Sequence, residues 1–257
     1  MTSSTLAPVE TLSTGHRVRL PLELTFDVYG GTFLAAAGPL GDRLPEGCTP
    51  VRLAPGVGTI VLAGIHYRDV GVFDPYDEFA VIVPCVRDGL DVPLLGPATG
   101  EVGGYVDFLP VTTEASVALG REIWGYPKTI ADVRFDRRAG GWTVTLEREG
   151  KTICRLTAPK TRPRGRTTTA FSYTAKDDRL LRTRVEVDGP IAVRPLDPRV
   201  TADCGQDEYG QGLETLLLGH RSVASLIGRR VGARLHAGEA VGTVADGSGR
   251  TAEIDRV

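Results

Sequence analysis

The stretch G-R-E-I-W-G-Y-P-K-T-I-A-D-V at residues 120–133 places one lysine, Lys128, among apolar and aromatic side chains. Lysine is scarce in this chain, because only four of the 30 basic residues are lysines and the other three lie beside turns or among polar residues. An apolar environment disfavours the charged form of a lysine and lowers its pKa, by up to about 3–5 units when the group is fully buried. The stretch therefore indicates a candidate nucleophile at Lys128. The alternative is an ammonium group that reaches water along an apolar surface.

A second segment, P-Y-D-E-F-A-V-I-V-P at residues 75–84, carries an acidic residue, Glu78, at the start of an apolar run. Together, G-R-E-I-W-G-Y-P-K and this segment resemble the acetoacetate decarboxylase superfamily. In that family G-R-E is followed by an aromatic residue, a proline and the Schiff-base lysine, and an acidic residue enters the active site before an apolar strand. The resemblance is clearest from residue 67 to residue 133. It implies that Lys128 and Glu78 are the catalytic residues.

Two departures from the family's pattern concern the substrate. The decarboxylase proper has a second lysine directly after the reactive one, and here that position is Thr129. It also has an arginine near its N-terminal strand that helps to hold the substrate carboxylate, whereas residues 29–34 here read Y-G-G-T-F-L. Imine chemistry can survive both changes. We therefore expect a small-molecule keto substrate other than acetoacetate itself.

The resemblance implies a lyase that needs no cofactor, because the lysine imine withdraws electrons from the neighbouring bond. Breaking a C–COO⁻ bond would give decarboxylation. Other bonds would give aldol, retro-aldol or dehydration chemistry, as in family members that act as aldolase-dehydratases or in secondary metabolism. Both routes pass through an enamine, with which Glu78 can exchange a proton. The further residues expected at the substrate-binding site are Tyr76, Tyr126, Trp124, Arg121, Glu122 and His66.

Three of these residues have a structural interpretation beside the functional one. Arg121 and Glu122 are adjacent on the predicted helix and point in different directions, so they cannot act as one pair on a substrate. We expect them to have a structural role or to form part of the cavity wall. His66 could line the cavity from a strand end, and a structural histidine is the alternative.

Two other classes of function stay open at this level. A barrel that binds or cyclises a polyketide-like metabolite without an imine would use its shape and the acid–base chemistry of Glu78. A structural or ligand-sensing subunit would need no reactive amine at all. A covalent adduct on Lys128 would separate the Schiff-base enzyme from both.

Composition limits the partners and the location that we expect. The net charge of −2 gives no reason to expect nucleic acid or an anionic membrane surface as a partner. No apolar run approaches the roughly 18 residues of a membrane span, and residues 1–14 lack the features of a signal peptide. We expect a cytoplasmic protein whose four cysteines are reduced thiols. The four histidines have no metal-site spacing, so no metal is expected. The resemblance implies a homo-oligomer.

The predicted fold is strand-rich. The 32 glycines and 17 prolines indicate many turns, and apolar or alternating runs predict strands at residues 16–27, 58–65 and 78–86. The one convincing helix of the first half covers residues 113–124 and stops at Gly125.

The resemblance implies an α+β fold, mostly β. Its centre would be an antiparallel, partly closed, cone-like β-barrel with a few outer helices. Residues 1–15 are predicted to be a flexible lead-in, and residues 16–257 a single domain.

Overall fold

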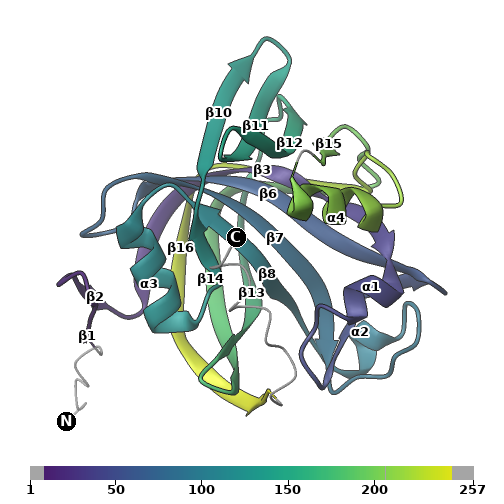
Figure 1. Cartoon of the computed structure of the whole chain (residues 1–257), viewed down its shortest axis with the longest axis horizontal. Helices are drawn as coiled ribbons and strands as arrows, with labels where there is room; N and C mark the ends of the chain where they lie inside the picture. Colours follow the sequence, from purple (N-terminus) through teal and green to yellow (C-terminus); the bar gives the residue numbers. More distant parts are fainter. Residues whose placement is uncertain (1–8, 206, 245–257) are drawn as a thin grey trace.

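Seven strands close into a β-barrel in the computed structural model, which describes residues 9–205 and 207–244 (Figure 1). In order around the ring they are β7 (Tyr76–Arg87), β6 (Val57–Asp69), β3 (Leu22–Ala36), β16 (Ala224–Thr243), β14 (Arg179–Pro195), β13 (Gly165–Lys176) and β8 (Glu101–Val111), which pairs with β7 again. All neighbours run antiparallel except β8 and β13, which pair in parallel. The structure thus confirms the expected mostly-β barrel and adds one parallel pairing to it.

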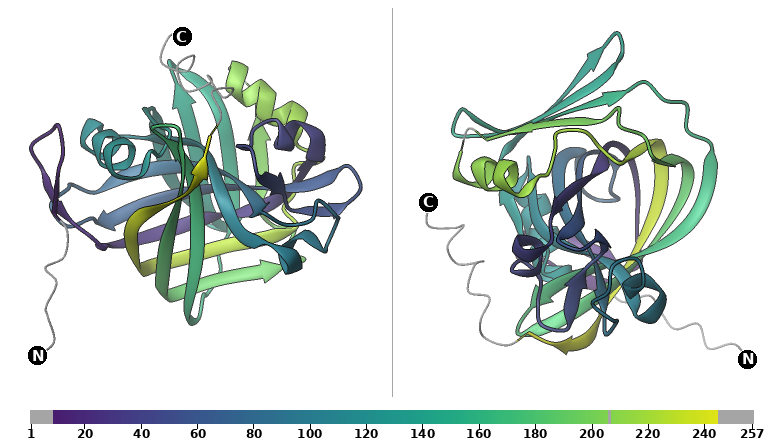
Figure 2. Two further views of the ribbon diagram at one scale, coloured as in Figure 1. Left: turned by 90° about the horizontal axis from the view of Figure 1, so that it is seen from below. Right: turned by 90° about the vertical axis from the view of Figure 1, so that its right-hand side faces the viewer.

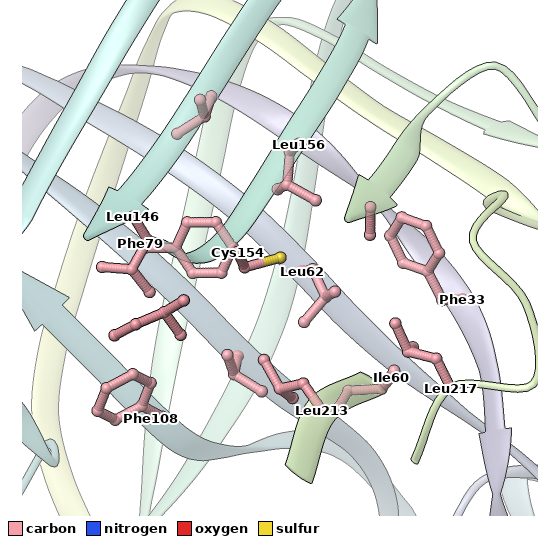
Figure 3. Close-up of a cluster of buried hydrophobic side chains, with 14 of the residues drawn as sticks. Phe33, Ile60, Leu62, Phe79, Phe108, Leu146, Cys154, Leu156, Leu213 and Leu217 are labelled. Carbon is pink, nitrogen blue, oxygen red and sulfur yellow. The ribbon is translucent and has the colours of Figure 1, made fainter. Parts of the chain in front are cut away.

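A second sheet covers part of the outer surface of the barrel (Figure 2). It consists of β10 (Asp132–Arg138), β11 (Gly141–Arg148), β12 (Lys151–Pro159) and β15 (Thr201–Cys204). Its apolar side chains interlock with those on the outer face of β3, β6 and β7 (Figure 3). The approach is close at Gly64 of β6, where a Cβ atom would lie 2.4 Å from Cγ1 of Val144.

The barrel strands are apolar on both faces, because their side chains alternate between the interior and the covered outer surface. In β7, Phe79 (Figure 3) and Val81 belong to the outer core, together with residues of the second sheet. Tyr76 and Ala80 belong to the interior core. Glu78 lies between these two in the alternation, so its carboxylate points into the barrel.

Four helices lie outside the barrel in the described part of the chain: α1 (Ala37–Gly41), α2 (Gly96–Thr99), α3 (Glu114–Trp124) and α4 (Glu208–Leu216). The helix predicted at residues 113–124 is confirmed as α3. Its first turn is capped by Thr113, whose Oγ1 accepts a hydrogen bond from the Ser116 backbone at 3.3 Å. Gly125 ends it with a φ of 67°, a left-handed conformation that favours glycine. None of the described helices is long and apolar enough to cross a membrane.

The short strands complete the fold. They are β1 (Val9–Thr11), β2 (Arg17–Arg19), β4 (Cys48–Pro50), β5 (Arg52–Ala54) and β9 (Lys128–Ile130). β1 and β2 form a hairpin, and Leu12 between them is buried. This hairpin spans residue 15, at which we predicted the boundary of the lead-in. Residues 1–8 of the predicted lead-in lie outside the described residues.

The cysteines differ from the expectation of four reduced thiols. Cys154 of β12 lies directly opposite Cys204 of β15, and the two form a disulfide. Cys48 and Cys85 are free and buried. The prediction was wrong for the first pair because 50 residues separate the two cysteines in sequence. Only the pairing of β12 with β15 brings them together.

Candidate active site

The sharp exit from α3 delivers Lys128 to the barrel. At the end of the helix the Gly125 and Tyr126 amides donate to the carbonyls of Arg121 and Gly120, each at 3.1 Å. The chain then reverses and enters β9, which pairs in parallel with β8 so that Lys128 lies beside Leu109. The lysine side chain thereby enters the interior from the wall next to β7.

Lys128 is 4% exposed and has two polar partners. Its Nζ lies 2.8 Å from Oε2 of Glu78, and it donates a hydrogen bond to the Tyr76 hydroxyl at 3.2 Å. The ammonium also lies 4.9 Å from the centre of the Tyr76 ring, within range of a cation–π interaction. The structure therefore brings together Lys128, Glu78 and Tyr76, which the sequence separates by as many as 52 residues.

Tyr67 is a member of this site that the sequence analysis missed. Its hydroxyl donates to Oε1 of Glu78 at 3.2 Å, and its ring stacks on Tyr76 with the ring centres 4.6 Å apart. The two tyrosines are direct partners across β6 and β7. A hairpin register for residues 58–86 would have revealed Tyr67, since facing residues of antiparallel strands project to the same side.

The charge on Lys128 is set by two opposing effects. Burial alone would lower its pKa, but the attraction of Glu78 and the contact with Tyr76 outweigh burial and raise the pKa above its ordinary value. The expectation of a lowered pKa is therefore wrong. The sequence shows only the apolar neighbours of Lys128, whereas the fold also places the carboxylate of Glu78 beside it. Lys128 rests as an ammonium, and Glu78 is the nearest group that can take its proton.

The tyrosine hydroxyls around this pair stay neutral. Burial raises the pKa of both Tyr76 and Tyr126 to about 12. The charges of Glu78 and Lys128 also act on the pKa of Tyr126, in opposite directions. The Tyr126 hydroxyl lies 2.9 Å from Oγ of Ser172. The interior therefore presents neutral phenols next to one ion pair, which suits hydrogen bonding to a carbonyl oxygen.

Trp124 and Arg121 support the site from the wall. Trp124 is 1% exposed and donates from Nε1 to the carbonyl of His236 at 2.7 Å, which fastens the end of α3 to β16. Arg121 donates from Nε to the carbonyl of Lys128 at 2.7 Å. Both residues thus position the backbone around the lysine.

Glu122 and His66 lie elsewhere. Glu122 is exposed and accepts hydrogen bonds from the backbone and hydroxyl of Ser13, in the hairpin of β1 and β2. His66 lies on the outer face of β6, where its Nδ1 is 2.6 Å from Oδ1 of Asp77. His66 and Tyr67 are consecutive on a strand, so their side chains point to opposite faces. Neither Glu122 nor His66 reaches the interior that holds Lys128.

Metal ligands do not gather within residues 9–205 and 207–244, where no three His, Cys, Asp or Glu side chains could hold one ion.

Gly120 makes room for the lysine, and this carries a prediction. A Cβ atom at this position would lie 2.5 Å from Cδ and 2.6 Å from Cε of Lys128. Because the far end of that side chain is held by Glu78 and Tyr76, we expect Gly120→Ala to destabilise the protein by about 1–3 kcal/mol in urea unfolding. This would occur despite the better helix propensity of alanine. The control is Gly38→Ala in α1, where nothing lies within 4 Å of the added atom. Equal stability of the two variants would contradict the prediction.

Comparison with known proteins gives the same fold and a family match. The sequence model of the family described as acetoacetate decarboxylase (ADC) matches residues 33–222. None of the curated proteins matches the chain. Acetoacetate decarboxylase from Legionella pneumophila subsp. pneumophila str. Philadelphia 1 is similar in structure, with a TM-score of 0.63 at 18% identity and 94% of each chain covered.

Two further solved structures have similar folds. MppR, an enduracididine biosynthesis enzyme complexed with the condensation product of pyruvate and imidazole 4-carboxaldehyde, has a TM-score of 0.60 at 14% identity, covering 86% of this chain and 89% of its own. An acetoacetate decarboxylase-like enzyme from Sphingomonas wittichii RW1 has a TM-score of 0.54 at 16% identity, covering 87% of this chain and 94% of its own. At these identities the likeness concerns the fold.

Proposed function

The chain belongs to the acetoacetate decarboxylase family, and from this premise we propose that it is a cofactor-independent lyase whose nucleophile is Lys128. One observation carries the proposal: the amine of Lys128 is buried, with Nζ 2.8 Å from the Glu78 carboxylate. An adjacent general base is one of the ways in which proteins activate a nucleophile, and Glu78 can act as that base for the Lys128 amine.

The first half of the reaction makes the imine. Glu78 takes a proton from the Lys128 ammonium, and the neutral amine attacks the ketone carbonyl of the substrate. Glu78 gives this proton to the departing oxygen, so that loss of water leaves a protonated imine on Nζ and a Glu78 carboxylate. The Tyr76 hydroxyl, 3.2 Å from Nζ, orients the amine and can hydrogen-bond to the oxygen that leaves as water.

The second half breaks a bond next to the imine carbon. The electron pair of a C–COO⁻, C–C or C–H bond moves into the imine, which gives an enamine and releases carbon dioxide, a carbonyl compound or a proton. Glu78 takes up a proton, either the one that the C–C or C–H route releases or, in decarboxylation, one from solvent, and delivers it to the enamine carbon. Water then hydrolyses the imine and restores the amine of Lys128.

We favour an aldol-type reaction of a keto acid or larger ketone over acetoacetate decarboxylation. Residues 29–34 lack the arginine, and Thr129 replaces the second lysine, that accompany acetoacetate in the family. The phenols of Tyr67, Tyr76 and Tyr126 instead surround the ion pair with neutral hydrogen-bonding groups. The similar fold of MppR, complexed with a condensation product of pyruvate, supports this preference by analogy.

The raised pKa of Lys128 supports a second candidate. If the lysine stays an ammonium throughout, Glu78 is the only group of the pair that reacts with the substrate. The positive charge of Lys128 then only adjusts the acidity of Glu78. The barrel would then bind or cyclise a polyketide-like ketone without an imine.

Reductive trapping separates the two candidates. The protein would be incubated with pyruvate, acetoacetate or acetopyruvate and sodium borohydride, and its peptides analysed by mass spectrometry. We expect a reduced adduct on the peptide that contains Lys128. Lys128→Ala should lose it, whereas the control Lys176→Ala should keep it. An adduct on Lys151, Lys160 or Lys176 would contradict the site, and no adduct with any of the ketones would favour the non-imine candidate.

A further inference from the structure

A cavity of about 460 Å³ lies outside the barrel, between β3 and β16 on one side and the second sheet on the other. Its lining comes from both sheets and from the loop that follows β12, and includes Tyr29, Trp142 and Ile227. Figure 1 shows the second sheet over β3, with β16 beside it.

This cavity is separate from the interior that holds Lys128. Tyr29 of β3 faces Gly64 of β6, and Gly64 contacts the second sheet. Tyr67, three residues further along β6, projects to the opposite face and contacts Glu78. The wall of the barrel therefore stands between the two sites.

Basic side chains from several segments of the chain line the cavity. Its basic lining residues are Arg137 and Arg138 of β10, Lys160 and Arg162 of the loop after β12, and Arg229 of β16. Among the described residues, Arg138 has one carboxylate within ion-pair distance, Asp136 at 3.7 Å, and the other four have none. The Asp27 carboxylate near Arg229 is already held by Arg68 at 2.6 Å and by the Arg230 amide at 2.7 Å. Five cations around one hollow attract an anion.

Two hydroxyls of the lining, those of Tyr29 and Thr161, are buried and lack a hydrogen bond of normal geometry. The Arg229 guanidinium approaches the Tyr29 oxygen, but as a donor it provides no acceptor for the hydroxyl hydrogen. Tyr29 is 2% exposed, and its ring stacks on Trp142 with the centres 4.9 Å apart. A buried hydroxyl whose hydrogen has no acceptor is unfavourable. An acceptor atom of a bound ligand would remove this penalty.

We propose that this cavity binds a small molecule bearing a phosphate group, held by Arg137, Arg162 and Arg229 with the Tyr29 hydroxyl as a further donor. Guanidinium groups form paired, charge-assisted hydrogen bonds with phosphate oxygens, and several of them match a multiply charged anion. The part-buried Trp142 ring, which stacks on Tyr29, offers an apolar surface to the rest of the ligand.

Isothermal titration calorimetry of the full chain with inorganic pyrophosphate tests the proposal. We expect saturable binding of wild type that weakens about tenfold in Arg137→Gln and in Arg162→Gln, as the loss of one charge-assisted hydrogen bond predicts. Both side chains are exposed, so folding should be unaffected. Tyr29→Phe should also weaken binding without changing the charge.

The matched control is Arg164→Gln, an exposed arginine of the same loop that does not line the cavity. We expect it to change the affinity less than twofold. The double variant Lys128→Met/Glu78→Gln, which leaves no buried charge unpaired, should keep the wild-type affinity. Absence of binding to wild type would overturn the proposal, as would an equal loss in Arg164→Gln and Arg162→Gln. A large loss in the double variant would place the anion in the barrel interior instead. Because Lys128 takes no part, this result stands or falls separately from the Schiff-base proposal.

Discussion

Glu78→Gln will make the stability of this protein depend on pH through Lys128, with a loss that is largest at pH 6 and shrinks towards pH 9. In the native protein the attraction of Glu78 outweighs burial and raises the pKa of Lys128. Glutamine keeps the shape of Glu78 and can still accept from the Tyr67 hydroxyl, but it carries no charge. Burial then acts alone, and it lowers a lysine pKa by up to about 3–5 units.

The direction of the pH dependence follows from whether the folded or the unfolded state binds more protons. With a raised folded pKa, the contribution of Lys128 to stability is fully present below the unfolded pKa of about 10.4, and is lost only as pH rises through the folded value. It is therefore constant from pH 6 to pH 9. In Glu78→Gln the folded pKa falls below the unfolded one, so the unfolded chain binds more protons between the two values and stability rises with pH.

Urea unfolding of both proteins at several values between pH 6 and pH 9 measures this effect, because the difference between them cancels the titration of the other groups. Glu239→Gln is the control, since Glu239 is exposed and its loss should produce a small difference that does not vary with pH. A large, constant difference for Glu78→Gln would show that Lys128 does not depend on Glu78 for its charge.

Lys128→Met will destabilise the protein by about 3–5 kcal/mol at pH 7, and a second change, Glu78→Gln, will restore most of that loss. Both side chains of the pair are almost fully buried, at 4% and 3% exposure. Removing one partner leaves the other charge buried without compensation, whereas replacing both with neutral groups of similar shape removes the penalty. Free energies of unfolding for the two single variants and the double variant give the coupling directly.

An exposed ion pair gives the comparison for this cycle. Arg234 and Glu23 lie 3.1 Å apart with both side chains more than half exposed. Because water screens such a pair, Arg234→Met should have little effect. If the losses of Lys128→Met and Glu78→Gln simply add in the double variant, the two groups do not interact in the folded protein.

The parts of the site that sequence reasoning located are those that lie close together along the chain. The end of α3, the turn at Gly125 and the lysine after Pro127 form one continuous segment, and capping and glycine preferences predict its shape. Glu78 and Tyr76 lie at the start of an apolar run that predicts a strand. Tyr67 could not be found in this way, because its role depends on the register between β6 and β7.

Local sequence patterns and the family resemblance predicted the mostly-β class, the capped helix before Lys128, and both segments of the candidate site. These features depend on the conformational preferences of short segments and on motifs of a few residues. Neither requires contacts between distant parts of the chain. Strand register and barrel closure fix which face each strand turns to the interior, and hence that Tyr67 joins the site while His66 does not. They also place Cys154 against Cys204, and Glu78 beside Lys128, which keeps the lysine an ammonium. One cause explains all of these features. Charge, pairing and exposure depend on neighbours in space, and barrel closure brings together residues that lie tens of positions apart in sequence.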